Sequence, residues 1–304
     1  MRLSRHAAVL VGAIALVMTS LLPGTALAKE GGSAGPNVAF TRASLSSGTH
    51  AGVVLSGTGL VLAAGGLASG TYADPFGHPP IAYESGTWIG AWTSTPFSYD
   101  ELVASWNAET PAGTWVRIEM QGRGSGRETK LYTLGIWASG DGDIHRTSVS
   151  LQGDGDGFIA IDTFVRGRKA LPLDGYRLQV TLYRRAGTGT TPTLRAVGAM
   201  VSAAPSKWTI PSATTRTERR VLAVPEYSQE THIGHFPEYD NGGEAWCSPT
   251  STAMVLRFWG TGPDAAALAA FPGSDHLDGQ VDHAARYVYD WNYNGAGNWP
   301  YNTA

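Results

Sequence analysis

The sequence predicts a multi-domain fold: an N-terminal all-β sandwich of the jelly-roll type over residues 37–203, followed by a smaller α+β domain over residues 221–304. Three observations lead to this class. Apolar and polar residues alternate with a period of two in several stretches of the first part. The chain carries 39 glycines and only 15% charged residues, which is typical of short strands joined by many turns. A polar, proline-punctuated stretch at 204–220 then separates the strands from a region of helical periodicity, as expected of a linker.

The alternation is clearest in two stretches of the β part, residues 115–120 and 176–183. In the second of these, Leu178, Val180 and Leu182 fall on one face of a strand. Further strands are expected at 53–63, 131–138, 147–151, 158–165 and 194–201. Glycine-rich and Asp-Gly sequences supply the turns between them, at 122–126, 140–143 and 154–157. Many short strands with tight turns favour a sandwich.

Two features of the β part suggest ligands, and a simpler explanation competes with each. Asp141 and Asp154 open Asp-Gly pairs that resemble calcium loops. Twelve-residue EF-hand loops from these positions would end in Gln152 and Val165 instead of glutamate, which favours plain turns. Five tryptophans could form a sugar-stacking platform, but aromatic residues at strand positions more often pack in the core. The five are Trp88, Trp92, Trp106, Trp115 and Trp137.

The first 28 residues have the pattern of a secretory signal peptide. Arg2 and Arg5 precede an apolar stretch at 7–22, and Ala26-Leu27-Ala28 is a cleavage motif before Lys29. A retained N-terminal anchor is the alternative, but the apolar stretch is short for a membrane span. We therefore expect a secreted protein.

The composition of the mature chain, which begins with a Gly/Ser linker at 29–36, narrows the function further. Removal of 1–28 takes two of the 22 basic residues and none of the 25 acidic ones, which leaves a net charge of −5. This charge argues against a nucleic-acid partner. No later stretch is long and apolar enough to predict a membrane span. A single cysteine cannot form an internal disulfide, and an unpaired exported cysteine is a candidate reactive thiol.

That cysteine, Cys247, is the most informative residue of the C-terminal part. It follows a Gly-rich loop at 241–243 and begins a helix-forming segment, in which Pro249 suits the first turn and Gly260 and Gly262 mark the end. The free N–H groups of a helix N-terminus favour the thiolate, which is the form that attacks carbonyl carbons. A buried cysteine that packs as a small hydrophobe is the ordinary alternative. The loop-to-helix context and the expected export favour a nucleophile.

Local patterns predict the elements around this helix. Residues 221–224 are typical of a short strand that leads into a loop. An alanine-rich segment follows at 263–271, and apolar residues have helical spacing over 281–290. These local patterns suit the α+β class, which the family resemblance described next implies for this part.

Two motifs of this part resemble those of a known enzyme family. Val224-Pro225-x-Tyr227-Ser228-Gln229 is followed by Trp246-Cys247-Ser248-Pro249-Thr250-Ser251 and the apolar residues 254–256. Together they resemble the bacteriocin-processing-peptidase-like branch of the papain-fold cysteine peptidases, over residues 222–304. The resemblance implies a papain-like domain that acts on peptides or proteins, with Cys247 as nucleophile and Gln229 as oxyanion partner. Ser248 stands where many relatives have glycine, and similar exported proteins carry an N-terminal β domain with a segment like residues 105–111.

The same resemblance implies a histidine on a later strand, followed by Asp or Asn, and neither stands where it is expected. His276 and His283 are the only histidines after the cysteine, and His283 falls on a predicted helix, where we expect a structural role. The sequence therefore predicts a truncated papain-like domain that lacks part of its sheet and exposes apolar surface. Such a chain is expected to be weakly active or inactive by itself.

A second pair of histidines precedes the cysteine. His232 and His235 have the His-x-x-His spacing of a metal site, with Glu238 and Asp240 nearby. Because the sequence shows no third ligand on a rigid element, we expect no zinc here, and no other metal or cofactor.

The sequence leaves three functions open. The first is an exported cysteine peptidase, and the second is a cell-wall or carbohydrate-binding β-sandwich protein with a degenerate peptidase-like segment. The third is an amidase or transglutaminase-like activity, since the same Cys-His chemistry serves acyl transfer generally.

Overall fold

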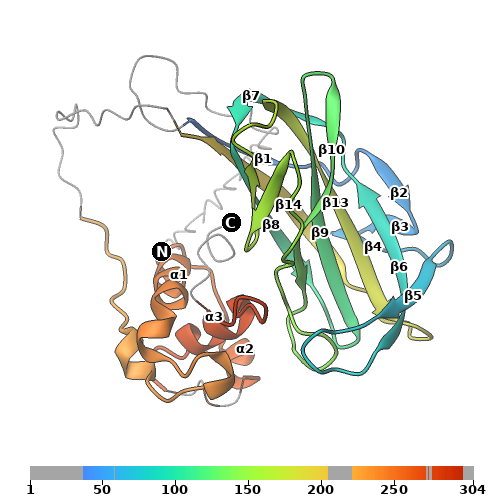
Figure 1. Cartoon of the computed structure of the whole chain (residues 1–304). Helices are drawn as coiled ribbons and strands as arrows, with labels where there is room; N and C mark the ends of the chain where they lie inside the picture. Colours follow the sequence, from blue (N-terminus) through green and yellow to red (C-terminus); the bar gives the residue numbers. More distant parts are fainter. Residues whose placement is uncertain (1–36, 58, 205–220, 272, 274–275, 297–304) are drawn as a thin grey trace, which may run out of the picture.

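The computed structural model describes residues 37–57, 59–204, 221–271, 273 and 276–296 (Figure 1). The predicted signal peptide at 1–28 and the linker at 29–36 lie outside the described residues, and so does the predicted linker at 204–220 except for its first residue. No helix among the described residues is both long and apolar enough to cross a membrane.

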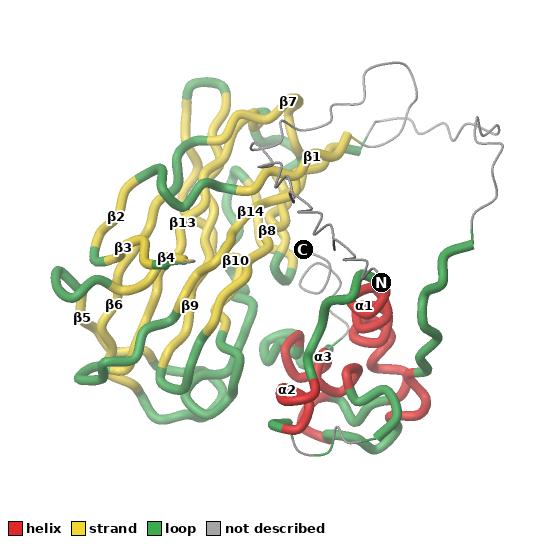
Figure 2. Tube along the Cα trace, turned by 180° about the vertical axis from the view of Figure 1, so that it is seen from behind, coloured by secondary structure: helices red, strands yellow, loops and turns green. Residues whose placement is uncertain are grey.

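The first part of the chain consists of two antiparallel sheets (Figures 1 and 2). One sheet runs in the order β11-β12-β8-β14-β4-β3, with β1 also paired to β14. Its strands are β1 (Asn37–Arg42), β3 (Val53–Ser56), β4 (Gly59–Leu62), β8 (Glu101–Glu109), β11 (Gly157–Ala160), β12 (Thr163–Arg166) and β14 (Thr193–Ala203). The other runs in the order β10-β9-β13-β6-β2, with β5 on β6 and β7 on β13. Its strands are β2 (Thr49–Ala51), β5 (Ala68–Tyr72), β6 (Ile81–Ile89), β7 (Thr93–Tyr99), β9 (Thr114–Gly124), β10 (Arg127–Trp137) and β13 (Leu173–Arg185).

A single hydrophobic core joins the two sheets. Leu102 and Val197 come from the first sheet and Ile118 and Val180 from the second, and all four are buried in the same cluster. Each buried side chain of this size contributes roughly 1.5–3 kcal/mol. The predicted β-rich domain with alternating core strands is confirmed, because residues 115–120 lie in β9 and residues 176–183 in β13. Its jelly-roll type stays a prediction.

Three of the predicted strands differ from the structure. Residues 53–63 form a hairpin of β3 and β4, in which Gly57 has a positive φ of 56°. Residues 158–165 form the hairpin of β11 and β12, with Ile161 in the left-handed region at φ 64°. Polar or glycine residues mark both turns, Ser56 and Gly57 in the first and Asp162 in the second, but each interruption is short enough that the apolar residues on either side suggest one strand. Residues 147–151 form no strand beyond one bridge at Thr147, because Leu151 leaves the sheet with a positive φ and is fully exposed.

The contacts of the tryptophans and of the Asp-Gly pairs show which explanation holds for each. Trp88 and Trp115 are buried, while Trp106 and Trp137 pack against the core. Trp92 lies beside two arginine guanidinium groups, at 4.7 and 4.8 Å from its ring centroid. These positions give no shared stacking platform. The Asp-Gly pairs form turns, since the Asp154 carboxylate accepts backbone N–H groups two and three residues ahead.

The second part of the chain is helical among its described residues. It contains three 3-10 helices, η1 (Gln229–His232), η2 (Pro237–Tyr239) and η3 (Gly243–Trp246), and three α-helices, α1 (Cys247–Phe258), α2 (Ala265–Ala269) and α3 (Gln280–Val288). The predicted helices after Cys247 and over 281–290 are confirmed as α1 and α3, and the alanine-rich segment at 263–271 contains α2. The predicted strand at 221–224 is wrong, because no described strand lies beside it to share hydrogen bonds. The described residues therefore show the helices of the expected α+β domain and no sheet.

The helical part docks on the β part through the connection between β10 and β11 (Figures 1 and 2). The buried carboxylate of Asp290 accepts a hydrogen bond from the backbone N–H of Ser148 at 3.0 Å. The hydroxyl of Tyr239 donates to the carboxylate of Asp141 at 2.8 Å. The β part thus holds two separate points of the helical part in place.

Candidate functional site

Cys247 is the first residue of α1 and is exposed. The chain reaches it through η3, which begins at Gly243; both Gly243 and the preceding Gly242 have positive φ, at 61° and 66°. Gly242 is essential to this path, because a Cβ there would lie 1.7 Å from the carbonyl oxygen of His232. The sequence thus places the sulfur at a helix N-terminus, as predicted, and leaves it open to solvent.

The start of α1 suits a developing negative charge. Trp246 precedes the helix and makes no side-chain cap, so no side-chain acceptor occupies the first N–H groups from that position. Unsatisfied N–H groups of a first turn stabilise anions. The helix start itself is fixed, since Trp246 is fully buried and its indole N–H donates to the carbonyl of Tyr239 at 2.6 Å.

Gln229 begins η1, the short helix that packs against η3. The backbone N–H of nearby Tyr227 contacts the Met254 sulfur on α1 at 3.5 Å, so the whole segment runs beside the cysteine helix. The Gln229 amide donates to the Glu230 carboxylate at 3.2 Å. Its predicted role as an oxyanion donor requires this amide to turn toward the sulfur, and that role stays a prediction.

No described histidine lies within hydrogen-bond distance of the Cys247 sulfur. His283 is on α3, as predicted, where its ring packs 4.6 Å from that of Tyr287. Burial, and then the charge of Arg286, lower the pKa of His283 below its ordinary value. His276 lies with the other pair of histidines, away from the thiol.

The main feature that the sequence did not predict is a group of three histidines and one aspartate. His232, His235, His276 and Asp282 each offer one ligand atom, and these atoms all lie within 4.8 Å of one another. Burial raises the pKa of Asp282, but hydrogen bonds from His232 and His235 and the charge of His276 outweigh it, so the pKa is lower than usual. The His-x-x-His spacing was the only local signal. The third and fourth members come from 41 and 47 residues beyond His235, a separation that only the fold closes.

Comparison with known families identifies the chain. A family model described as Peptidase C39 N-terminal domain matches residues 37–202, which is more than half of the sequence. The protein belongs to the C39 peptidase-like family. A second model, described as Peptidase_C39 like family, matches residues 221–304. These matches confirm the predicted papain-fold cysteine-peptidase branch. No curated protein matches the chain.

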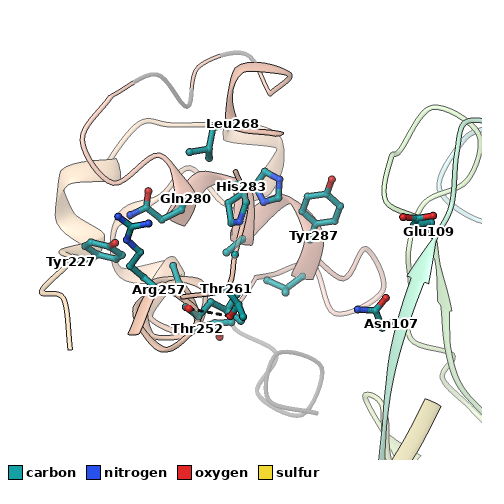
Figure 3. A pocket seen from close by; sticks show the side chains of 16 residues that line it. Asn107, Glu109, Tyr227, Thr252, Arg257, Thr261, Leu268, Gln280, His283 and Tyr287 are labelled. Carbon is teal, nitrogen blue, oxygen red and sulfur yellow. Dashed lines mark hydrogen bonds between the residues drawn. The ribbon is translucent and has the colours of Figure 1, made fainter. Parts of the chain in front are cut away.

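A cavity of about 870 Å³ lies where the helical and β parts of this C39 protein face each other (Figure 3). His283 and Tyr287 on α3 line it on one side, with Asn107 and Glu109 on β8 across from them. On α1 its lining begins at Thr252, about 7.5 Å of helix rise beyond the cysteine. The cavity is therefore separate from the thiol.

Proposed function

We propose that this C39 protein is an exported cysteine-peptidase-type hydrolase that cleaves peptide or amide bonds through the thiolate of Cys247. One observation carries the proposal: the only cysteine is exposed at the first residue of a helix, inside the region matched by the peptidase-like family model. We further propose that residues 221–304 correspond to the nucleophile half of a papain-like domain. The pattern of residues 1–28 supports export.

The proposed reaction follows from the position of the sulfur. The Cys247 thiolate attacks the carbonyl carbon, and the oxyanion forms next to the first N–H groups of α1 and the amide of Gln229. The amine takes a proton from water as it leaves, and a thioester remains on the sulfur; a second water then hydrolyses the thioester, which releases the carboxylic acid and restores the thiolate. No described imidazole lies within hydrogen-bond distance of the sulfur, so an ester whose leaving group needs no proton is the suitable test substrate.

Mass spectrometry of the secreted protein tests both the proposed export and the proposed nucleophile. The intact mass is expected to correspond to a chain that begins at Lys29, and a p-nitrophenyl ester is expected to add one acyl group to Cys247. Iodoacetamide is expected to label the Cys247 thiol of the folded protein, because this thiol is exposed. A Cys247 thiol that iodoacetamide does not label, or acyl transfer that persists in Cys247→Ala, would refute the nucleophile.

Gln229→Ala provides the matched comparison. Loss of an oxyanion donor lowers acylation by roughly 10²–10³-fold, whereas iodoacetamide forms no oxyanion and is expected to react at the wild-type rate. Gln280→Ala, which removes a glutamine of the separate cavity, is the control and is expected to change neither rate. Equal losses in acylation and alkylation would assign Gln229 a merely structural role.

The glycan-binding alternative receives no support from a specific observation. The five tryptophans proposed for it are buried, packed on the core or held between arginines.

A further inference from the structure

We propose that His232, His235, His276 and Asp282 bind a divalent transition-metal ion of the zinc class, and that this ion fastens the loop before Cys247 to helix α3. The four side chains come from three segments: η1 with the turn after it, the loop before α3, and α3 itself. The proposal is independent of the catalytic role of the cysteine, which is not one of the four.

The hydrogen bonding of His276 is the strongest evidence. Its Nδ1 lies 2.6 Å from the carbonyl oxygen of Leu277, and because a carbonyl only accepts, Nδ1 carries a proton. In the neutral ring the lone pair is then on Nε2, which lies 2.6 Å from Oδ2 of Asp282. This close pair does not have the angle of a hydrogen bond, since Nε2 is buried without a hydrogen-bond partner among the described residues. A lone pair that faces a carboxylate, on a ring whose other nitrogen donates to a backbone carbonyl, is the arrangement of a metal-binding histidine.

His232 shows the same need for a ligand. Its side chain is fully buried, with Nδ1 at 3.1 Å from Oδ2 of Asp282 and Nε2 without a partner among the described residues. In each of the three protonation states of a free imidazole, at least one of the two His232 nitrogens lacks a hydrogen-bond partner among the described residues. A buried polar atom without a partner destabilises the fold, so native proteins rarely keep one without a reason.

The set of donors selects the metal. Three imidazole nitrogens and one carboxylate oxygen suit zinc and its neighbours, whereas calcium and magnesium prefer oxygen ligands. Donor atoms around a tetrahedral zinc are separated by roughly 3.3 Å, given metal–ligand distances of about 2.0–2.1 Å. The four donor atoms here lie within 4.8 Å of one another, and small side-chain rotations would bring them to this separation. Four protein ligands form a closed site, which is typical of structural zinc.

One side of the group is open to entering metal. The side chains of His235 and His276 are 32% and 29% exposed, while those of His232 and Asp282 are fully buried. The buried pair fixes the site, and the two partly exposed histidines close over the ion.

The location gives the ion a consequence for the thiol. The carbonyl of His232 packs directly against Gly242. The imidazole ring of His232 lies 5.9 Å from the ring of Trp246, the residue before Cys247. Fixing His232 to α3 therefore fixes the loop that delivers the cysteine. The ion acts as a staple for the nucleophile and takes no part in the reaction.

Metal analysis of the whole protein, purified without a histidine tag, tests the proposal. After removal of metal with EDTA and dialysis against zinc sulfate, elemental analysis is expected to find one zinc per chain, and zinc is expected to raise the melting temperature. Cobalt in place of zinc is expected to give the visible absorption of a tetrahedral site. No stoichiometric zinc, or zinc that leaves the melting temperature unchanged, overturns the proposal.

Variants assign the ligands. His276→Ala and His235→Ala change partly exposed side chains, and each is expected to weaken zinc binding by at least ~10–100-fold. His283→Ala removes a histidine of the same helical part that lies outside the group, and Cys247→Ala removes the thiol. Both controls are expected to bind zinc as the wild type does. Loss of zinc in Cys247→Ala, or full zinc binding in His276→Ala and His235→Ala, contradicts the assigned ligands.

Discussion

At the scale of single residues, Asp162 shows how the fold changes the chemistry of an ordinary turn residue. It lies between β11 and β12 and is 3% exposed. Burial raises the pKa of Asp162 to about 8. The hydrogen bond from its own N–H lowers this pKa, the charge of Asp290 raises it by less, and a hydrogen bond from Thr163 lowers it slightly. The folded protein therefore keeps this carboxyl neutral across most of the physiological range.

This pKa has a definite sign for stability. Between about pH 4 and pH 8 the unfolded chain loses the Asp162 proton and the folded chain keeps it, so the residue lowers the free energy of unfolding increasingly as pH rises. Asp162→Asn mimics the neutral acid, and we expect it to be more stable than the wild type by about 1–4 kcal/mol at pH 8 and equally stable near pH 4. Urea unfolding at several pH values measures the difference.

Asp174→Asn is the control, because Asp174 is an exposed acid on β13. Its effect on the free energy of unfolding is expected to lack this rise with pH. A constant difference between Asp162→Asn and wild type from pH 4 to pH 8 would show that Asp162 is ionised in the fold.

At the scale of elements, α1 is built differently from the usual amphipathic helix. Its buried residues are Ser248, Pro249, Thr250 and Ala253, all near the start. The larger apolar residues point outward, with Val255 54% and Trp259 73% exposed. The exposed apolar surface expected of this segment is therefore present. The first turn, not an apolar face, anchors the helix and so fixes the cysteine.

The loop before α1 gives a test of this anchoring. Gly242 has φ 66° and ψ −155°, a conformation that is essentially restricted to glycine, and its missing Cβ leaves room for the His232 carbonyl. We expect Gly242→Ala to lower the stability of the helical part by more than ~2–3 kcal/mol, as measured by calorimetry.

Gly260→Ala separates the cost of the backbone conformation from the cost of the close contact with the His232 carbonyl. Gly260 also has a positive φ, 69°, but no atom lies within 4 Å of its Cβ position. Only the conformational cost of about 1–2 kcal/mol is expected there. Equal effects of the two substitutions would mean that the close contact with His232 is unimportant.

At the scale of the whole molecule, the β part acts as a support for the helical part. The chain just after α3 is held by several contacts to the loop after β10, and the rings of Trp291 and His145 lie 4.0 Å apart. Asp290 is the centre of this contact. It is fully buried and accepts backbone N–H groups of Ser148, Asn292 and Tyr293.

Removal of this carboxylate is expected to loosen the docking. Asp290→Ala removes the acceptor of the buried Ser148 N–H, at a cost of about 1–3 kcal/mol. Hydrogen exchange at Ser148 and in α3 is expected to accelerate, while exchange in the core strands β9 and β13 stays unchanged. Tyr293→Ala is the control, because the Tyr293 side chain is 48% exposed and its N–H remains. Unchanged exchange at Ser148 in Asp290→Ala would show that the two parts dock without it.

The sequence by itself determined the local features. Period-two alternation predicted β9 and β13, helix-forming residues bounded by glycines predicted α1, and the loop-to-helix motif placed Cys247 at a helix start. Each of these depends on residues close together in the chain, where spacing decides structure. The turns inside 53–63 and 158–165 were missed, since a few polar or glycine residues between two apolar stretches do not show whether the chain reverses there.

Only the tertiary structure decided which distant residues meet. The pair His232 and His235 gave one half of a metal-binding group, and the fold brought His276 and Asp282 to it from other segments. In the same way it placed Asp290 against the N–H of Ser148, 142 residues away. Spacing along the chain carries no information on such contacts, because they depend on how sheets, loops and helices pack, and packing is a property of the folded whole.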